Sequence, residues 1–170
     1  NIVSSNYTVD STFFENIKSD AIDIDFSDGK ISDSKFLNVK NDAIDFSGSV
    51  SKVYSIDFKN IGDKVISVGE NSNININKIN GFNSNIGIAS KDGSKTIAKN
   101  IFFTNINYPF TAYQKKKAYG YGKLYLEDFT VKKFKKKFIN DANSSIINNK
   151  SMKKIGVNNS EIDKIIENII

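Results

Sequence analysis

The feature that most constrains this chain is an internal repeat of about 22 residues. A Phe-x-Asn-Ile pattern, or a variant of it, begins at Phe14, Phe36, Phe58, Ile79 and Phe103, at intervals of 22, 22, 21 and 24 residues. A second apolar pattern keeps phase with it and begins at Ala21, Ala43, Val65, Ile86 and Phe110. Two patterns in phase over five units indicate a repeat architecture in which each unit contacts its neighbours.

Inside each unit, apolar and polar residues alternate with a period of two over short stretches, which predicts short β-strands. No stripe of helical period persists through these units. Two or three short strands cannot close a core alone, but stacked copies can, with equivalent strands about 4.8 Å apart. The sequence therefore predicts an all-β fold, a single-stranded parallel β-helix of about 6–8 coils of about 22 residues.

Stacking predicts columns of equivalent residues inside and outside the tube. The expected core columns are Ile22, Ile44, Ile66, Ile86, Phe110 and Phe14, Phe36, Phe58, Ile79, Phe103. A column of Asn residues follows the Phe strand, because Asn tolerates a left-handed backbone and its amide can bond to the next amide. Its expected members are Asn16, Asn38, Asn60 and Asn105, with Gly81 in the intervening coil. We interpret this column as structural.

The chain resembles the right-handed parallel β-helix superfamily, the pectate-lyase-like fold, in its Asn-rich repeat form. The resemblance rests on "SDAIDIDF", "NDAIDFSG", the Phe-x-Asn-Ile series and "ISVGENS" with "IGIASKDGS", and it covers residues 2–133. The right-handed coil is implied by this resemblance alone. Residues 1–133 are thus expected to form the coils.

Residues 134–170 are expected to form degenerate last coils and a cap. Phe134 and Phe138 are expected to point inward, with the neighbouring Lys residues outward. The stretch from Ser160 to Ile170 has Ile residues at helical spacing, so it is expected to form a short capping helix or a last strand pair. The first coil lacks a visible cap, and we expect the chain to be part of a longer one or to be covered there by another subunit.

Composition excludes several kinds of chemistry. The chain has no Cys, His or Trp, which excludes disulfides, zinc sites of Cys or His, and catalysis by imidazole or thiolate. No apolar run is long enough for a transmembrane helix. Charge is polarised, because residues 1–90 carry 8 Lys and 12 acidic residues, whereas residues 91–170 carry 16 Lys and 7 acidic residues.

The repeated Asp-Ala-Ile-Asp stretch predicts carboxylates on one outer face. With Ile22 and Ile24 inward, Asp23, Asp25 and Asp45 point outward as neighbours. Like charges at that spacing repel, so either Ca²⁺ bound by these three Asp residues or a nearby Lys is expected to neutralise them. Asp20, Asp42 and Asp63 are expected to stack at the preceding turn and to bond to backbone amides there, with Lys64 nearby.

The same face continues upward as two expected columns, whose members are Asp23, Asp45, Ser67, Gly87, Thr111 and Asp25, Ser47, Gly69, Ala89, Tyr113. Such a groove suits an extended polysaccharide, either acidic or neutral. The expected ligand-binding residues are Ser67, Glu70, Ser90, Tyr113, Gln114, Tyr119 and Tyr121. The two Tyr residues of "AYGYG" either stack on sugar or pack on the solenoid. If the chain is an enzyme, the resemblance implies Lys91 or Lys115 as base, with Asp23 and Asp45 as catalytic acids or metal ligands.

Three functions remain open from the sequence. The first is an extracellular or cell-surface module that is structural, binds polysaccharide, or both. The second is a polysaccharide lyase or glycoside hydrolase. The third is a subunit of a trimeric or filamentous surface assembly such as a phage tailspike. The Lys-rich stretches near Gln114 and Val131 fit an acidic polysaccharide or a solvated face better than nucleic acid or lipid.

Overall fold

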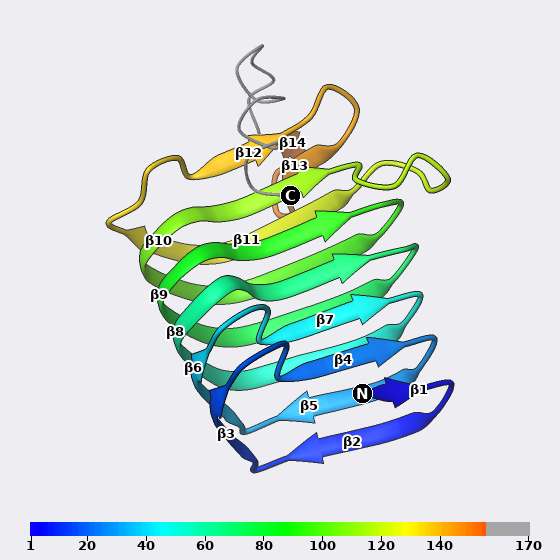
Figure 1. Cartoon of the computed structure of the whole chain (residues 1–170). Coiled ribbons are helices and arrows are strands. Elements are labelled where there is room, and N and C mark those ends of the chain that lie inside the picture. The colour runs from blue at the N-terminus through cyan, green and yellow to red at the C-terminus, as the bar shows by residue number, and fades with distance from the viewer. Residues whose placement is uncertain (156–170) are drawn as a thin grey trace.

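The computed structural model describes residues 1–155, which form a parallel β-solenoid of about seven turns (Figure 1). None of these residues is helical. The described part of the chain thus contains no helix that could cross a membrane. Each complete turn passes through three parallel sheets, which we call face A, face B and face C. The predicted fold class is confirmed.

The strands divide among the three faces by register. Face A comprises β1 (Ile2–Val3), β4 (Ile22–Asp25), β7 (Ile44–Ser47), the last parts of β8 (Val50–Gly69), β9 (Asn73–Lys91) and β10 (Lys95–Tyr113), and β12 (Phe138–Asn140). Face B comprises β2 (Asn6–Asp10), β5 (Asp28–Ser32), the first parts of β8, β9, β10 and β11 (Lys123–Lys132), and β13 (Ser145–Asn148). Face C comprises β3 (Phe13–Ile17), β6 (Lys35–Val39), the middle parts of β8, β9 and β10, and the end of β11. β14 (Lys153–Lys154) pairs antiparallel with β13.

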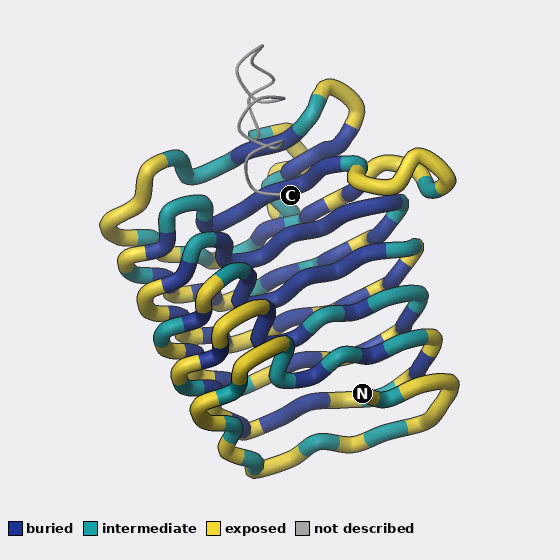
Figure 2. Tube along the Cα trace, in the orientation of Figure 1, coloured by how far each residue is buried: buried dark blue, intermediate teal, exposed yellow. Residues whose placement is uncertain are grey.

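Stacked apolar side chains fill the inside of the tube. On face A the inward column in register is Ile22, Ile44, Ile66, Ile88, Phe110 and Phe138. Buried and less buried residues alternate along the lower strands of this face (Figure 2). Burial of one such side chain stabilises the fold by about 1.5–3 kcal/mol. The column therefore holds successive turns together.

The predicted columns are wrong by two residues in the β9 turn. Ile66 pairs with Ile88 rather than with Ile86, and Phe58 pairs with Gly81 rather than with Ile79. The offset between β8 and β9 is 23 residues from Val50 to Ile61 and 22 from Lys64 onward, because β8 is irregular between Ile61 and Lys64. The "INGF" stretch consequently presents its Phe82 to the outside.

The Asn column forms a hydrogen-bonded ladder between faces C and A. Each side-chain amide donates to the amide oxygen one turn below, at 2.9–3.1 Å. All five members have φ between 55° and 60°, and they are Asn16, Asn38, Asn60, Asn83 and Asn105. The predicted turn role is confirmed, but Asn83 rather than Gly81 occupies the slot in the β9 turn. Gly81 lies two positions earlier, in the Phe column.

The Phe column of face C is interrupted at that glycine. Phe14 stacks on Phe36 and Phe36 on Phe58, with ring centroids 4.7 and 4.9 Å apart. The ring of Phe103 then lies so close to Gly81 that a Cβ there would be 2.7 Å from it. The missing side chain thus makes room for an aromatic ring from the next turn.

A second ladder, of Ser residues between faces A and B, was not predicted. The backbone N–H groups of Ser5, Ser27 and Ser49 donate to a Ser hydroxyl one turn above, each at 3.0 Å. The ladder continues through Ser72 and Ser94. Ser is common throughout the chain, so its spacing gave little signal.

The upper end partly matches the sequence expectation. Phe138 points inward and stacks near Phe110, with centroids 5.9 Å apart. Phe134 is 42% exposed, so its predicted inward orientation is wrong. The predicted helix or strand pair from Ser160 lies outside the described residues.

Candidate functional site

The outward side of face A carries the predicted site. Its first column in register is Asp23, Asp45, Ser67, Ala89 and Thr111. Its second column is Asp25, Ser47, Gly69, Lys91 and Tyr113, with Lys91 and Tyr113 paired between β9 and β10. The shift in the β9 turn therefore replaces the expected Gly87 and Ala89 by Ala89 and Lys91.

The upper half of face A is not an open groove. Ser67, Ala89 and Thr111 are fully buried, and Tyr113 is 1% exposed. Ile86, Ala89, Tyr113 and Ile139 form a second apolar cluster, separate from the core. The predicted polar floor for a sugar chain is thus limited to the lower half of the face, where Asp23, Asp25 and Asp45 are half-buried.

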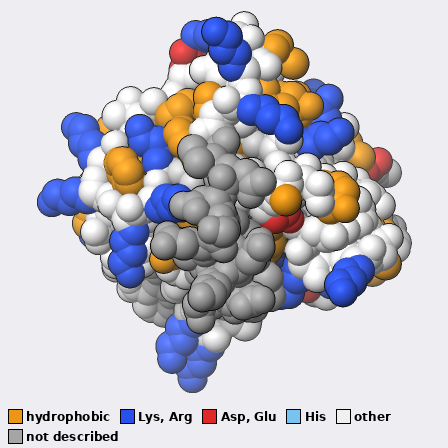
Figure 3. Space-filling model, turned by 90° about the horizontal axis from the view of Figure 1, so that it is seen from above, with side chains coloured by type: hydrophobic (Ala, Val, Ile, Leu, Met, Phe, Trp, Pro, Cys, Tyr) orange, Lys and Arg blue, Asp and Glu red, His pale blue; other side chains and the backbone are white. Residues whose placement is uncertain are grey.

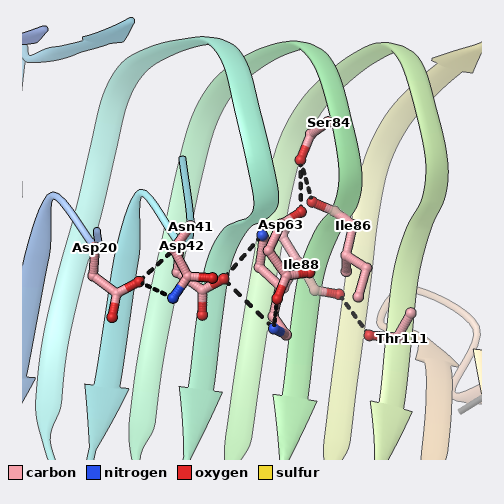
Figure 4. A network of polar contacts seen from close by, with 9 residues as sticks. Asp20, Asn41, Asp42, Asp63, Ser84, Ile86, Ile88 and Thr111 are labelled. Atoms are coloured by element: carbon pink, nitrogen blue, oxygen red, sulfur yellow. Dashed lines mark hydrogen bonds and ion pairs between the residues drawn. The ribbon is translucent and has the colours of Figure 1, made fainter. Parts of the chain in front are cut away.

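Carboxylates at the start of face A bond to the backbone of the next turn (Figure 4). Asp20 accepts from the N–H of Asp42 at 2.9 Å, and Asp42 accepts from the N–H of Lys64 at 3.0 Å. The predicted bonds of these two Asp residues to backbone amides are present, but the amides belong to the next turn of the solenoid rather than to the same turn. Lys64, rather than Asp63, occupies the third position of this column, because Lys64 follows Asp42 by the same 22 residues that separate Asp42 from Asp20.

Lys64 forms a buried ion-pair network. Its ammonium contacts Asp63 and lies 3.5 Å from Asp42 Oδ1. Burial raises the pKa of Asp42 to about 6, and the charge of Lys64 opposes that rise. Burial of Lys64 lowers its pKa, but Asp42 and Asp63 outweigh the burial and leave the pKa raised. Among the described residues, neutralisation by a neighbouring Lys thus occurs at Asp42 and Asp63, and not at the Asp23, Asp25 and Asp45 group for which it was predicted.

The lower carboxylates repel one another. Burial and then the charges of Asp25 and Asp45 raise the pKa of Asp23. Within residues 1–155, Asp45 Oδ1 and the hydroxyl of its register neighbour Ser67 are buried without a hydrogen-bond partner. No group of three acidic side chains in that part of the chain has the geometry of a metal site. The calcium site of Asp23, Asp25 and Asp45 stays a prediction.

The two candidate bases lie in different environments. Lys91 is 9% exposed, and its Cε lies 3.5 Å from where a Gly69 Cβ would be. Burial lowers its pKa, and the charge of Asp45 opposes this. Lys115 is exposed. Of the two, Lys91 has the environment expected of a base.

Asp92 holds the loop that carries the predicted Tyr residues. Its carboxylate accepts from the N–H groups of Lys115 and Lys116, both at 2.6 Å. The Lys116 ammonium pairs with Glu70. Asp92 is 1% exposed, and its role could not be predicted from the sequence, since a lone Asp after a strand is common.

The remaining predicted ligand residues divide into three groups. Gln114 donates its N–H to Asp141 at 2.7 Å and its side chain to the Tyr119 carbonyl, so it secures the loop. Tyr119 is half-buried, and Tyr121 is 44% exposed. Ser90 pairs with Val68 and lies inside the tube, where it bonds to Lys123 O and Thr96, so its predicted position on the outer face is wrong.

Seen from above, Lys side chains project at several points around the upper end of the molecule (Figure 3).

Comparisons with family models, with curated proteins and with solved structures found no match for this chain. The class of protein that the fold defines is a parallel β-solenoid.

Proposed function

We propose that this chain is a structural β-solenoid module of an extracellular or cell-surface protein, and that it binds polysaccharide without cleaving it. One observation carries the structural part. Asp20, Asp42 and Asp92 bond to backbone amides of neighbouring turns or loops, and Lys64 bridges two acids. Charged groups at the ends of face A thus hold successive turns together.

We further propose that the module belongs to the pectate-lyase-like superfamily in its Asn-rich form. The Asn ladder and the three-sheet turn support this assignment. Repeating turns also present equivalent outward positions about 4.8 Å apart. An extended polymer with its own repeat suits such a surface better than a compact ligand does.

A polysaccharide lyase or glycoside hydrolase is the second candidate, and the environment of Lys91 favours it. A buried Lys of lowered pKa beside a carboxylate fits a general base. Asp45, which has an oxygen without a partner among the described residues, lies on the same face. The same burial, however, restricts the approach of a polymer to Lys91.

The two candidates are separated by assaying binding and cleavage together. The wild-type chain and Asp23→Asn/Asp45→Asn are run through gels containing polygalacturonate, alginate or dextran. Unsaturated products and new reducing ends are measured in parallel. We expect retardation by at least one polymer and no product. Product formation that is lost in the double variant overturns the proposal in favour of an enzyme, and retardation by none of the polymers removes the binding part.

A further inference from the structure

Two exposed phenyl rings lie side by side on face C. Phe82 of β9 is 46% exposed and Phe102 of β10 is 41% exposed. Phe102 pairs with Asn80, two residues before Phe82, so the rings occupy diagonal positions on adjacent strands. The solenoid does not require apolar side chains there, because outward positions contribute nothing to the core. Paired exposed aromatic rings on a soluble surface are typical of an interaction site.

A shallow hollow of about 300 Å³ lies at these rings, and its lining includes Asp57, Lys59, Asn80, Phe82, Phe102 and Thr104. Asn80 donates one amide hydrogen to Asp57 at 2.9 Å. The accessible walls of the hollow are apolar, as the walls of small-ligand sites predominantly are.

One Lys residue lies on either side of the two rings along the solenoid axis. Lys59, Phe82, Thr104 and Lys132 form one column in register. The column spans three strand spacings, about 14 Å. The Lys132 ammonium lies 5.6 Å from the centroid of the Phe102 ring. The surface therefore alternates a cation, aromatic rings and a cation along the axis of the solenoid.

We infer that this surface, the Phe82–Phe102 patch, is a binding subsite for an acidic polysaccharide that runs along the solenoid axis. Sugar rings have apolar C–H faces that cover the phenyl rings, and their hydroxyl edges reach Asn80, Asp57 and Thr104. Uronate carboxylates pair with Lys59 and Lys132. The inference rests on the proposed polysaccharide-binding function and assigns its location.

Aromatic rings with Lys residues also bind single-stranded nucleic acid. A glycan is inferred here because it is the ligand of the proposed function, and binding of oligo(dT) is therefore one of the outcomes that the test distinguishes.

The test removes both rings and compares the result with a matched control. Phe82→Ala/Phe102→Ala is compared with Phe13→Ala, which removes a ring that is 58% exposed on the same face but outside the patch. The dissociation constant for polygalacturonate is measured by calorimetry. We expect at least a tenfold weakening in the double variant and no change in the control. Lys59→Gln/Lys132→Gln is expected to weaken binding and to flatten its salt dependence.

The other possible results distinguish failure of the inference from failure of the proposed function. If the wild type binds polygalacturonate and the ring variant binds equally well, the inference is overturned and the proposed function stands with another site. If the wild type binds no polysaccharide, the proposed function fails as well. A patch-dependent dimer in sedimentation velocity, or patch-dependent binding of oligo(dT) in place of polygalacturonate, also overturns the inference.

Discussion

Replacement of Asn60 by Ala is expected to destabilise the solenoid far more than an exposed position normally does. Asn60 donates to Asn38 at 2.9 Å and accepts from Asn83 at 3.0 Å. Its φ is 57°, in the left-handed region. The substitution therefore removes two bonds of the ladder and places a residue with a Cβ, but without a compensating amide, in that region.

The expected loss of stability is the sum of the two lost hydrogen bonds and the cost of the left-handed backbone. An intramolecular hydrogen bond contributes about 0.5–1.5 kcal/mol, and exposed bonds lie at the low end, so two contribute about 1–2 kcal/mol. A left-handed backbone costs Ala about 1–2 kcal/mol. The total is about 2–4 kcal/mol. Asn60→Gly loses the bonds but accepts the φ, so it is expected to lose about 1 kcal/mol less than Ala.

Urea unfolding followed by far-ultraviolet circular dichroism measures these differences. The control is Asn75→Ala, at an exposed strand position whose side chain makes no ladder bond among the described residues. It is expected to change stability by less than about 0.5 kcal/mol. The reasoning is refuted if Asn60→Ala and Asn75→Ala unfold at the same urea concentration.

Three further predictions concern buried groups. Burial raises the pKa of Asp42 to about 6, above its ordinary 3.8, so its contribution to stability is full at low pH and is lost as pH rises through 6. The stability of Asp42→Asn relative to wild type should accordingly rise between pH 4 and pH 7 in urea titrations, and a constant difference contradicts this. Lys64→Met is expected to cost about 3–5 kcal/mol, because Asp42 and Asp63 lose their cation, whereas Lys64→Met with Asp42→Asn and Asp63→Asn should cost less. If the single and triple variants lose the same stability, the loss does not come from the unpaired carboxylates. Gly81→Ala is expected to cost about 1–3 kcal/mol by clashing with Phe103, and Phe103→Leu should recover part of that loss. Unchanged thermal unfolding of Gly81→Ala contradicts the clash.

The sequence predicted the architecture because its main determinant is a period, and a period is visible without coordinates. Ile22, Ile44 and Ile66 are one period apart and form one column, as expected. The prediction failed in the β9 turn, where Ile86 and Ile79 were matched to the repeat by residue type, whereas the register follows an offset of 22 or 23 residues and selects Ile88 and Gly81.

The candidate site was less predictable than the fold. The repeat predicts which side chains point outward, but it does not predict whether other residues cover them. Tyr113 is buried although its position on the outer face was predicted correctly. The roles of Asp92 and of the Phe82–Phe102 patch depend on contacts between different turns. Such contacts follow from the exact offset between turns, which the repeat alone leaves undetermined by one or two residues.

Cysteine cross-linking tests the stacked coils most directly, because the chain has no Cys of its own. Leu37 and Lys59 are register partners on the outer side of face C, and Glu15 is paired with Leu37 one turn below. Adjacent parallel strands lie about 4.8 Å apart, within disulfide reach, whereas two spacings exceed it. Under mild oxidation, Leu37→Cys/Lys59→Cys is expected to form an intramolecular disulfide, seen by mass spectrometry, and Glu15→Cys/Lys59→Cys is not. Absence of the first disulfide, or equal formation of both, contradicts the stacked arrangement.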